Sequence, residues 1–170
     1  MEPKALLIRE PTESEWEWTA EAAEEIGGPV VVSAGCLYDL REHPTLIALW
    51  GQDPVGLIVF RESDDSFEVL AIKASRKNEG IGSALLSEVE DIARQRSIRC
   101  IGLSTTNDNL DALRFYQKRG FRVCAYHVGA FDDVLRLKGK SADAKVVGYF
   151  GIAMRDVIEL SKPVVPTQSA

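Results

Sequence analysis

Two glycines ahead of a helix are the first residues of this sequence whose spacing points to chemistry. Gly80-Ile81-Gly82 follows an apolar run with strand character at residues 67–72 and opens a strongly helical segment. The first turn of a helix presents unpaired backbone N–H groups and a partial positive charge, and glycines let an anion approach the backbone closely. The pattern therefore indicates a phosphate site, although alone it is a weak indication.

The residues around these glycines are also more basic than the rest of the chain. Residues 73–82 contain Lys73, Arg76 and Lys77 against Glu79, which leaves two positive charges in a chain whose formal net charge is −6. A negative chain lacks the basic face that general nucleic-acid binding requires. The sequence therefore predicts an anionic ligand at this loop and no nucleic-acid partner.

A second motif begins about thirty residues further on and reads Asn109-Leu-Asp-Ala-Leu-Arg-Phe-Tyr-Gln-Lys-Arg-Gly-Phe121. On a helix, Asn109, Ala112 and Tyr116 fall at i, i+3 and i+7 and share one face, whereas Phe115 turns about 100° away, toward the core. A slender ligand can lie along this face, and its end would meet the Tyr116 hydroxyl.

Hydrophobic periodicity and turn residues predict the elements that must position these motifs. Strands are expected at residues 4–9, 46–50, 55–61, 67–72, 98–104, 121–127 and 154–161, and helices at 16–26, from about 80, and at 109–119. The strands at 46–72 form an antiparallel meander, and a helical connection makes 67–72 and 98–104 parallel. Residues 30–32 favour a strand and 37–40 the start of a short helix; 129–138 is a candidate short helix and 139–150 a loop.

Length and composition indicate one globular domain at residues 1–161 and a flexible C-terminal tail at 162–170. No apolar run approaches the roughly 18 residues of a membrane span, and the N-terminus lacks the apolar region of a signal peptide. Three widely spaced cysteines argue against a disulfide framework and a zinc site. We therefore expect a cytoplasmic protein with no membrane association and no metal.

Taken together, the two motifs make this sequence resemble the GNAT superfamily of N-acetyltransferases, which use acetyl-CoA. The family's Gln/Arg-x-x-Gly-x-Gly/Ala motif corresponds to residues 77–82, with Lys77 in place of Gln or Arg. The family's Asn-x-x-Ala-x-x-Phe-Tyr-x-x-x-Gly-Phe motif is matched in full by residues 109–121. Lys77 loses the planar fork of Arg, and Glu79 adds a carboxylate just before the first glycine, so reduced cofactor affinity is expected.

The resemblance implies an α/β (α+β) GNAT fold: a central mixed, mostly antiparallel sheet with two splayed parallel strands, flanked by helices. It also implies acetyl-CoA as co-substrate and transfer of the acetyl group to a primary amine by direct attack in a ternary complex. The implied cofactor-binding residues lie on the strand, the loop, the helix start and the second motif: Leu70, Ala71, Ile72, Lys77, Asn78, Glu79, Gly80, Ile81, Gly82, Ser83, Asn109 and Ala112.

Two catalytic functions follow from the same resemblance. A bulge near Leu70 or Ala71 would free one amide to polarise the thioester carbonyl. Tyr116 would be the general acid that protonates the departing thiolate, because a tyrosine with its usual pKa near 10 stays protonated at neutral pH. The alternative for Tyr116 is a side chain that simply packs beside Phe115.

Glu68 is the candidate general base, acting through a water. It lies in an apolar strand and, by the period of two, on the same side as Leu70 and Ile72. A glutamate in solvent or paired to a lysine is the alternative interpretation, and His127 is the alternative base.

The amine acceptor is expected to be a small molecule or a peptide, and a homodimer is left open. Aromatic and acidic side chains of the early helices and the late connection would suit a cationic amine: Trp16, Trp18, Tyr38, His127, Asp132, Asp133, Tyr149 and Phe150. A different class of function also fits, a non-catalytic acyl-CoA-binding module with the GNAT fold. A dinucleotide-binding fold fits poorly, because the third glycine is missing and Arg99 and Cys100 stand where a ribose-binding acid belongs.

Overall fold

Seven strands form the central sheet of the computed structural model, which describes residues 6–142 and 145–165. In order across the sheet they are β1 (Leu6–Arg9), β4 (Thr45–Trp50), β5 (Asp53–Ser63), β6 (Ser66–Ala74), β7 (Cys100–Thr106), β9 (Val157–Pro163) and β8 (Arg122–His127). A separate hairpin consists of β2 (Val30–Ser33) and β3 (Cys36–Asp39). The helices are α1 (Trp16–Glu25), α2 (Ile81–Gln95), α3 (Leu110–Gln117) and α4 (Phe131–Leu137), with 3-10 turns at Glu13–Glu15, Leu40–Glu42 and Tyr149–Gly151.

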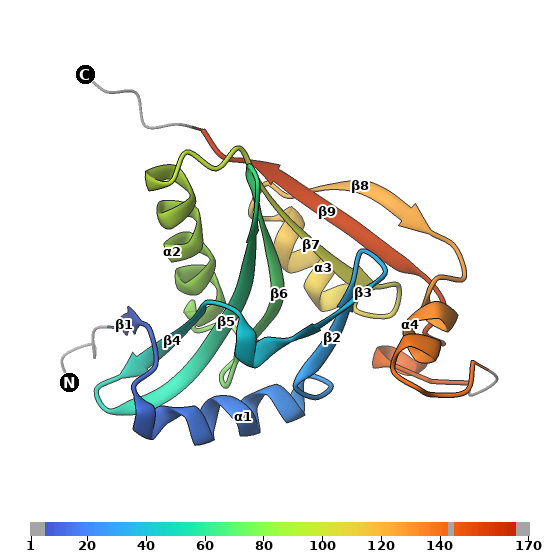
Figure 1. The fold of residues 1–170 in the computed structure, drawn as a ribbon, viewed down its shortest axis with the longest axis horizontal. Helices are drawn as coiled ribbons and strands as arrows, with labels where there is room; N and C mark the ends of the chain where they lie inside the picture. Colours follow the sequence, from blue (N-terminus) through green and yellow to red (C-terminus); the bar gives the residue numbers. More distant parts are fainter. Residues whose placement is uncertain (1–5, 143–144, 166–170) are drawn as a thin grey trace.

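Helices cover both faces of the sheet (Figure 1). On one face, α2 buries Leu85 and Val89 against Phe67 and Ile101 of the central strands, and α3 packs against the same core. On the other face, Ala22 of α1 and residues of the hairpin segment pack against a second, smaller core on β4, β5 and β6. The mixed α/β fold predicted from the sequence is therefore confirmed.

Strands β6 and β7 form the parallel pair, and their pairing is short. It joins residues 66–69 to residues 100–103 and ends there, although β6 continues to Ala74 and β7 to Thr106. On the other side of β6, Phe60 pairs with Val69 and Val59 pairs with Ala71, so Leu70 is the extra residue of a β-bulge. The predicted meander, the parallel pair and the position of the bulge are confirmed.

The segment that the sequence left open, residues 29–40, contains the β2–β3 hairpin. The alternative of a short helix over 37–40 is wrong for most of its length, because residues up to Asp39 belong to β3 and a 3-10 turn begins only at Leu40. The reason is the turn between the strands: Ala34 and Gly35 both have positive φ, as a two-residue hairpin turn of the I′ type requires.

The last strand extends further than the sequence predicted. β9 reaches Pro163, and the Lys162 ammonium donates to Glu90 Oε1 of α2 at 2.7 Å. The ordered chain therefore continues past residue 162, where the sequence placed the start of a tail. Residues 166–170 of that predicted tail lie outside the described residues.

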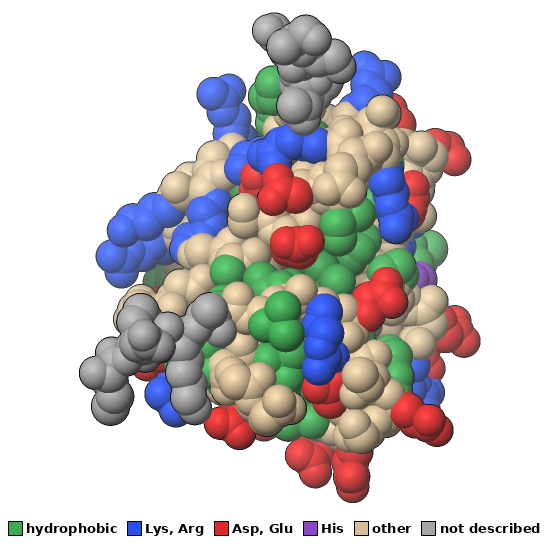
Figure 2. Space-filling view, turned by 90° about the vertical axis from the view of Figure 1, so that its left-hand side faces the viewer, with side chains coloured by type: hydrophobic (Ala, Val, Ile, Leu, Met, Phe, Trp, Pro, Cys, Tyr) green, Lys and Arg blue, Asp and Glu red, His purple; other side chains and the backbone are tan. Residues whose placement is uncertain are grey.

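Charge is unevenly distributed over the surface. Figure 2 shows acidic side chains gathered at the lower end of the molecule, at the height of α1, and basic side chains toward the upper and left-hand edges of the same face. Across the described residues, no helix is long and apolar enough to cross a membrane.

Gly56 of β5 provides a test of how α2 is seated on the sheet. A Cβ at this position would lie 2.6 Å from Ile81 Cγ2 and 2.9 Å from the Lys73 carbonyl oxygen. We expect Gly56→Ala to lower the free energy of unfolding by about 1–3 kcal/mol in urea titrations, because the start of α2 must move away.

The matched control is Gly102→Ala, where the nearest atom to the new Cβ, the Leu160 carbonyl oxygen, is 3.8 Å away. This substitution should change the free energy of unfolding by less than about 0.5 kcal/mol. Equal losses for the two variants would contradict the close seating of α2 on Gly56.

Candidate functional site

A groove of about 490 Å³ separates the start of α2 and its preceding loop from α3. Eight of the predicted cofactor-binding residues line it: Ile72, Lys77, Asn78, Gly80, Ile81, Gly82, Ser83 and Ala112. The other four, Leu70, Ala71, Glu79 and Asn109, are not among its lining residues. The two sequence motifs thus form the two walls of one groove.

Backbone conformation shapes the α2 wall of this groove. Gly80 is the N-cap of α2 with φ of 82°, and Asn78 before it also has a positive φ of 64°. The N–H groups of the first turn, from Ile81 to Ser83, have no partner within the helix. These N–H groups are the backbone donors at which the sequence predicted an anion site.

Gly82 sets the distance between the two walls. A Cβ on Gly82 would lie 3.2 Å from Phe115 Cζ, so the ring of Phe115 packs against α2 where a larger residue would push it away. As predicted, Tyr116 lines the groove and Phe115 packs against the α2-side core, but Phe115 lines the groove as well. Tyr116 is the more buried of the two, and Phe115 is half-buried beside the groove.

Tyr116 sits at the inner side of the groove with 6% of its surface exposed. Its ring makes edge contacts with Phe115 and Phe121, with centroids 5.1 and 5.6 Å apart. Burial raises the pKa of Tyr116 above the usual value of a tyrosine. Within the described part of the chain no group forms a hydrogen bond with its hydroxyl, which leaves that hydroxyl available to a ligand.

The remaining predicted residues of the groove region have local partners. Asn109 is the N-cap of α3, and its Oδ1 accepts a hydrogen bond from the Ala112 N–H at 3.1 Å. Lys77 reaches across the groove to Asp111, with Nζ and Oδ2 3.3 Å apart. Glu79 lies 3.9 Å from the Arg76 guanidinium, so a neighbouring cation offsets its charge.

Glu68 lies on the opposite face of the sheet from Ile72. Ile72 packs against the α2 core, whereas Ala71 belongs to the core on the α1 side. The prediction that Glu68, Leu70 and Ile72 share one side is wrong for Ile72, because the bulge at Leu70 inserts one residue and shifts the alternation by one.

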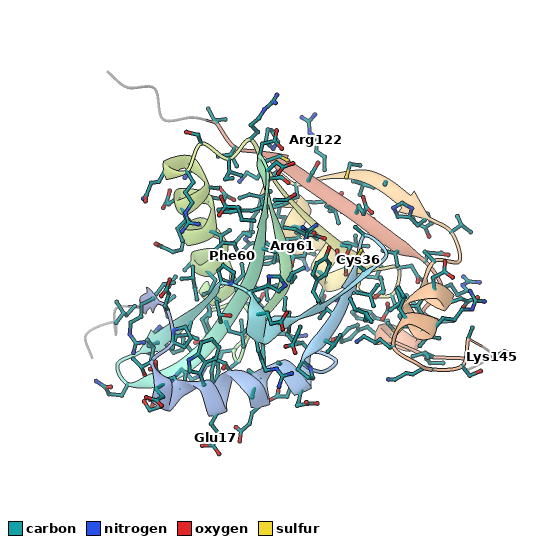
Figure 3. The ribbon with its side chains drawn as sticks, in the orientation of Figure 1. Glu17, Cys36, Phe60, Arg61, Arg122 and Lys145 are labelled. Atoms are coloured by element: carbon teal, nitrogen blue, oxygen red, sulfur yellow. The ribbon has the colours of Figure 1, made fainter. Side chains whose placement is uncertain are left out.

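Both carboxylate oxygens of Glu68 have partners. Ser33 of the hairpin donates its hydroxyl proton to Oε1, and Arg61 donates from Nε to Oε2 at 2.6 Å. Arg61 also lies over the ring of Tyr38 at 4.8 Å, near the end of the hairpin that carries Cys36 (Figure 3). The partner of Glu68 is therefore an arginine rather than the lysine or solvent considered from the sequence.

Further polar side chains continue from Glu68 toward β8. The Ser33 and Ser104 hydroxyls are 3.1 Å apart, and Ser104 pairs in register with Glu159 of β9. His127 Nε2 and Glu159 Oε1 are 2.9 Å apart on the exposed side of β8 and β9. We call this set the polar strip: Arg61, Glu68, Ser33, Ser104, Glu159 and His127.

The acceptor residues suggested by the sequence are dispersed. Tyr38 borders the polar strip through Arg61, whereas Trp18 packs into the α1-side core and Trp16 is largely exposed. Asp132 and Asp133 lie in the first turn of α4. The exposed rings of Tyr149 and Phe150 lie on a turn whose Tyr149 N–H donates to Oδ2 of the fully buried Asp108 at 2.9 Å.

No group of three or more His, Cys, Asp or Glu side chains among the described residues could hold a metal ion. All three cysteines are free.

Comparison with known proteins identifies the fold that carries this groove. The sequence profile of the acetyltransferase (GNAT) family matches residues 8–121. The chain belongs to the GNAT family. The Bacillus subtilis protein YxbD is 43% identical over 113 residues, which make up 66% of this chain and 71% of YxbD.

Solved GNAT structures share the fold over nearly the whole chain. A GNAT acetyltransferase from Elizabethkingia anophelis with acetyl-CoA bound superposes with a TM-score of 0.69 at 22% identity, covering 93% of this chain and 97% of that one. A Bacillus subtilis acetyltransferase in complex with CoA gives a TM-score of 0.66 at 19% identity, covering 94% and 98%.

Within this GNAT groove, sequence reasoning missed several lining side chains of α3 and of the two residues that follow it. Phe115, Arg114, Lys118 and Arg119 all line the groove. The family motif specifies the residues at 109, 112 and 116 but allows any residue at 114, 118 and 119. A match to the motif therefore could not identify the basic side chains at these three positions as groove residues. Asp111, Phe115 and Lys118 follow one another at helical spacings of four and three residues, so helical periodicity could have placed them on one face beside the groove.

The unpartnered hydroxyl of Tyr116 leads to a prediction about stability. We expect Tyr116→Phe to change the free energy of unfolding by less than about 1 kcal/mol, because it removes no intramolecular hydrogen bond. Tyr116→Ala should lower it by about 3–5 kcal/mol, since it leaves a cavity between Phe115 and Phe121. Urea denaturation of the three proteins measures both effects, and a loss in Tyr116→Phe as large as in Tyr116→Ala would show that the hydroxyl has a structural partner.

Proposed function

We propose that this protein is an N-acetyltransferase that moves the acetyl group of acetyl-CoA to a primary amine by direct attack in a ternary complex. The observation that carries the proposal is the placement of one unpartnered, protonated Tyr116 hydroxyl in a groove that starts at a phosphate-type helix N-terminus. GNAT structures of the same fold, one with CoA and one with acetyl-CoA bound, support the choice of co-substrate.

The groove has the chemistry that CoA requires. The first-turn amides of α2 and the basic side chains Arg76 and Lys77 suit the diphosphate. Beyond residue 69, β6 has no pairing with β7, so its backbone groups at 70–74 can bond the amides of an extended pantetheine. Acetyl-CoA supplies the acetyl thioester, and the residues of this chain hold it and move the protons.

Tyr116 is the proposed general acid. Its raised pKa keeps the proton on the hydroxyl well above neutral pH, so the residue can donate that proton to the departing thiolate. The bulge at Leu70 leaves a backbone amide outside the regular ladder with β5. This amide is the proposed donor to the thioester carbonyl oxygen.

Glu68 is the proposed general base, acting on the face of the sheet opposite the Tyr116 groove. Because Arg61 and Ser33 occupy its carboxylate oxygens, a proton from the amine would reach Glu68 through the hydroxyls of Ser33 and Ser104 or through a water. His127 is the alternative base, with Glu159 as the group that would stabilise its protonated form.

The proposed acceptor is a cationic amine, either a small molecule or a peptide. The carboxylates of the polar strip and the ring of Tyr38 next to it support this class. The decisive experiment measures release of the CoA thiol from acetyl-CoA with polyamines, aminoglycosides, amino acids and peptide N-termini as acceptors. Release above the hydrolysis background with one class supports the enzyme. Tight CoA binding without release for any amine supports the non-catalytic acyl-CoA-binding module.

Removal of the Tyr116 hydroxyl tests the general acid. Tyr116→Phe should lower kcat by about a hundredfold to ten-thousandfold, the usual contribution of acid catalysis. The affinity for acetyl-CoA should stay within about threefold, because the ring and its packing are kept. Steady-state thiol-release kinetics measure both values, and a kcat within about twofold of the wild type would remove Tyr116 from this function.

A negative charge at the start of α2 tests the diphosphate site. Gly80→Asp should weaken CoA binding by more than about tenfold in calorimetric titrations, because a carboxylate at the N-cap repels the diphosphate. The matched control is Gly139→Asp: Gly139 also has positive φ and nothing within 4 Å of its Cβ position, but it does not line the groove. Equal CoA affinity in both variants would contradict the assignment of the groove.

A further inference from the structure

Arg119 places a positive charge inside the groove without a carboxylate partner. It lines the groove just beyond the end of α3 and is half-buried. Its guanidinium carbon lies 3.6 Å from the centroid of the Phe115 ring, and Nη1 donates to the Phe115 carbonyl oxygen at 2.8 Å. Among the described residues no acidic side chain forms an ion pair with it.

Ser83 of α2 fixes the other side of the same guanidinium. Nε donates to Ser83 Oγ at 3.1 Å, and Nη2 donates to the same oxygen. Ser83 is the third residue of α2, in the turn whose backbone N–H groups lack helical partners. The guanidinium is thereby held next to the anion-binding amides of the groove.

Arg119 still has donors to offer. A guanidinium carries five N–H groups in a planar fork, and the three hydrogen bonds to Ser83 and Phe115 leave two of them. Burial removes part of the water around the Arg119 guanidinium and thereby lowers its pKa. No carboxylate of the described residues offsets this charge. An anion in the groove would supply a counter-charge.

Two other cations near the start of α2, Arg76 and Lys77, have carboxylate neighbours. Arg76 lies near Glu79, and Lys77, which stands at the family's Gln or Arg position, pairs with Asp111. The first turn of α2 itself contains no acidic residue. Arg114 and Lys118 also line the groove without an ion pair among the described residues, but of these basic side chains Arg119 alone hydrogen-bonds to the first turn of α2.

We propose that Arg119 binds the diphosphate of CoA, in place of the Gln or Arg that the family motif carries at position 77. This inference rests on the proposed use of acetyl-CoA. It adds a planar donor from α3 to a site otherwise built from the backbone of α2, and it offsets the repulsion expected from Glu79.

The test compares Arg119→Met with Arg94→Met as the matched control. Met keeps an unbranched apolar stem on the Phe115 ring and removes the charge. Arg94 of α2 is half-buried, pairs with Glu90 and Asp91, and does not line the groove. Calorimetric titrations use CoA, 3′-dephospho-CoA and pantetheine as ligands.

In Arg119→Met, affinity for CoA and for 3′-dephospho-CoA should fall by the same factor, about tenfold to a hundredfold, as expected for hydrogen bonds to a charged group. Affinity for pantetheine, which lacks the diphosphate, should not change, and Arg94→Met should bind all three ligands within about twofold of the wild type. Arg119→Lys should bind CoA more tightly than Arg119→Met, because an ammonium still attracts phosphate.

Three results would overturn the proposal: unchanged affinity for CoA, a loss confined to CoA over 3′-dephospho-CoA, or an equal loss for pantetheine. The second would assign Arg119 to the 3′-phosphate, and the third would show that Arg119 only holds the groove together. If Arg119→Met does not fold, Arg119→Lys takes its place in the titrations. If Arg119→Lys then binds CoA and pantetheine as tightly as the wild type does, the planar guanidinium is not needed for the diphosphate and the proposal is overturned. Failure of the wild-type protein to bind CoA at all would contradict the proposed function instead.

Discussion

The early end of the pairing between β6 and β7 is the constraint on which the rest of this site depends. After Val69 and Leu103 the two parallel strands no longer pair, although both continue. The backbone of residues 70–74 is then an open strand edge in the middle of a sheet, and such an edge needs hydrogen-bonding partners. The bulge at Leu70 falls at the same point. Strand geometry thus creates a place for an extended ligand before any side chain is considered.

The groove beside this edge is formed by two helices that approach each other at small residues. Gly56 lets Ile81 of α2 sit directly on β5, and Gly82 lets the ring of Phe115 sit directly on α2. These contacts bring the first-turn amides of α2 close to Tyr116 of α3 and to Arg119 just beyond the end of that helix. One wall of the groove therefore presents backbone N–H groups, and the other carries Tyr116, the proposed acid, and the positive charge of Arg119.

The sequence predicted what local spacing determines. The start of α2 after Gly80 and the presence of Tyr116 on a helix followed from motifs of a few residues, whereas the bulge near Leu70 followed from the family resemblance. The sequence did not predict what depends on one inserted residue or on distant partners. The bulge itself moved Glu68 and Ile72 to opposite faces, and only the hairpin turn at Ala34 brings Ser33 to Glu68. Arg119 was missed because its significance lies in its contact with Ser83, which is 36 residues away along the chain.

A crystal structure of the protein with CoA bound would show directly whether the ligand occupies this groove. We predict the diphosphate on the N–H groups of residues 81–83, pantetheine along the open edge of β6, and the thiol within hydrogen-bond reach of the Tyr116 hydroxyl, about 3–3.5 Å. CoA bound outside the groove, or a thiol turned away from Tyr116 while the diphosphate occupies the start of α2, would contradict this prediction.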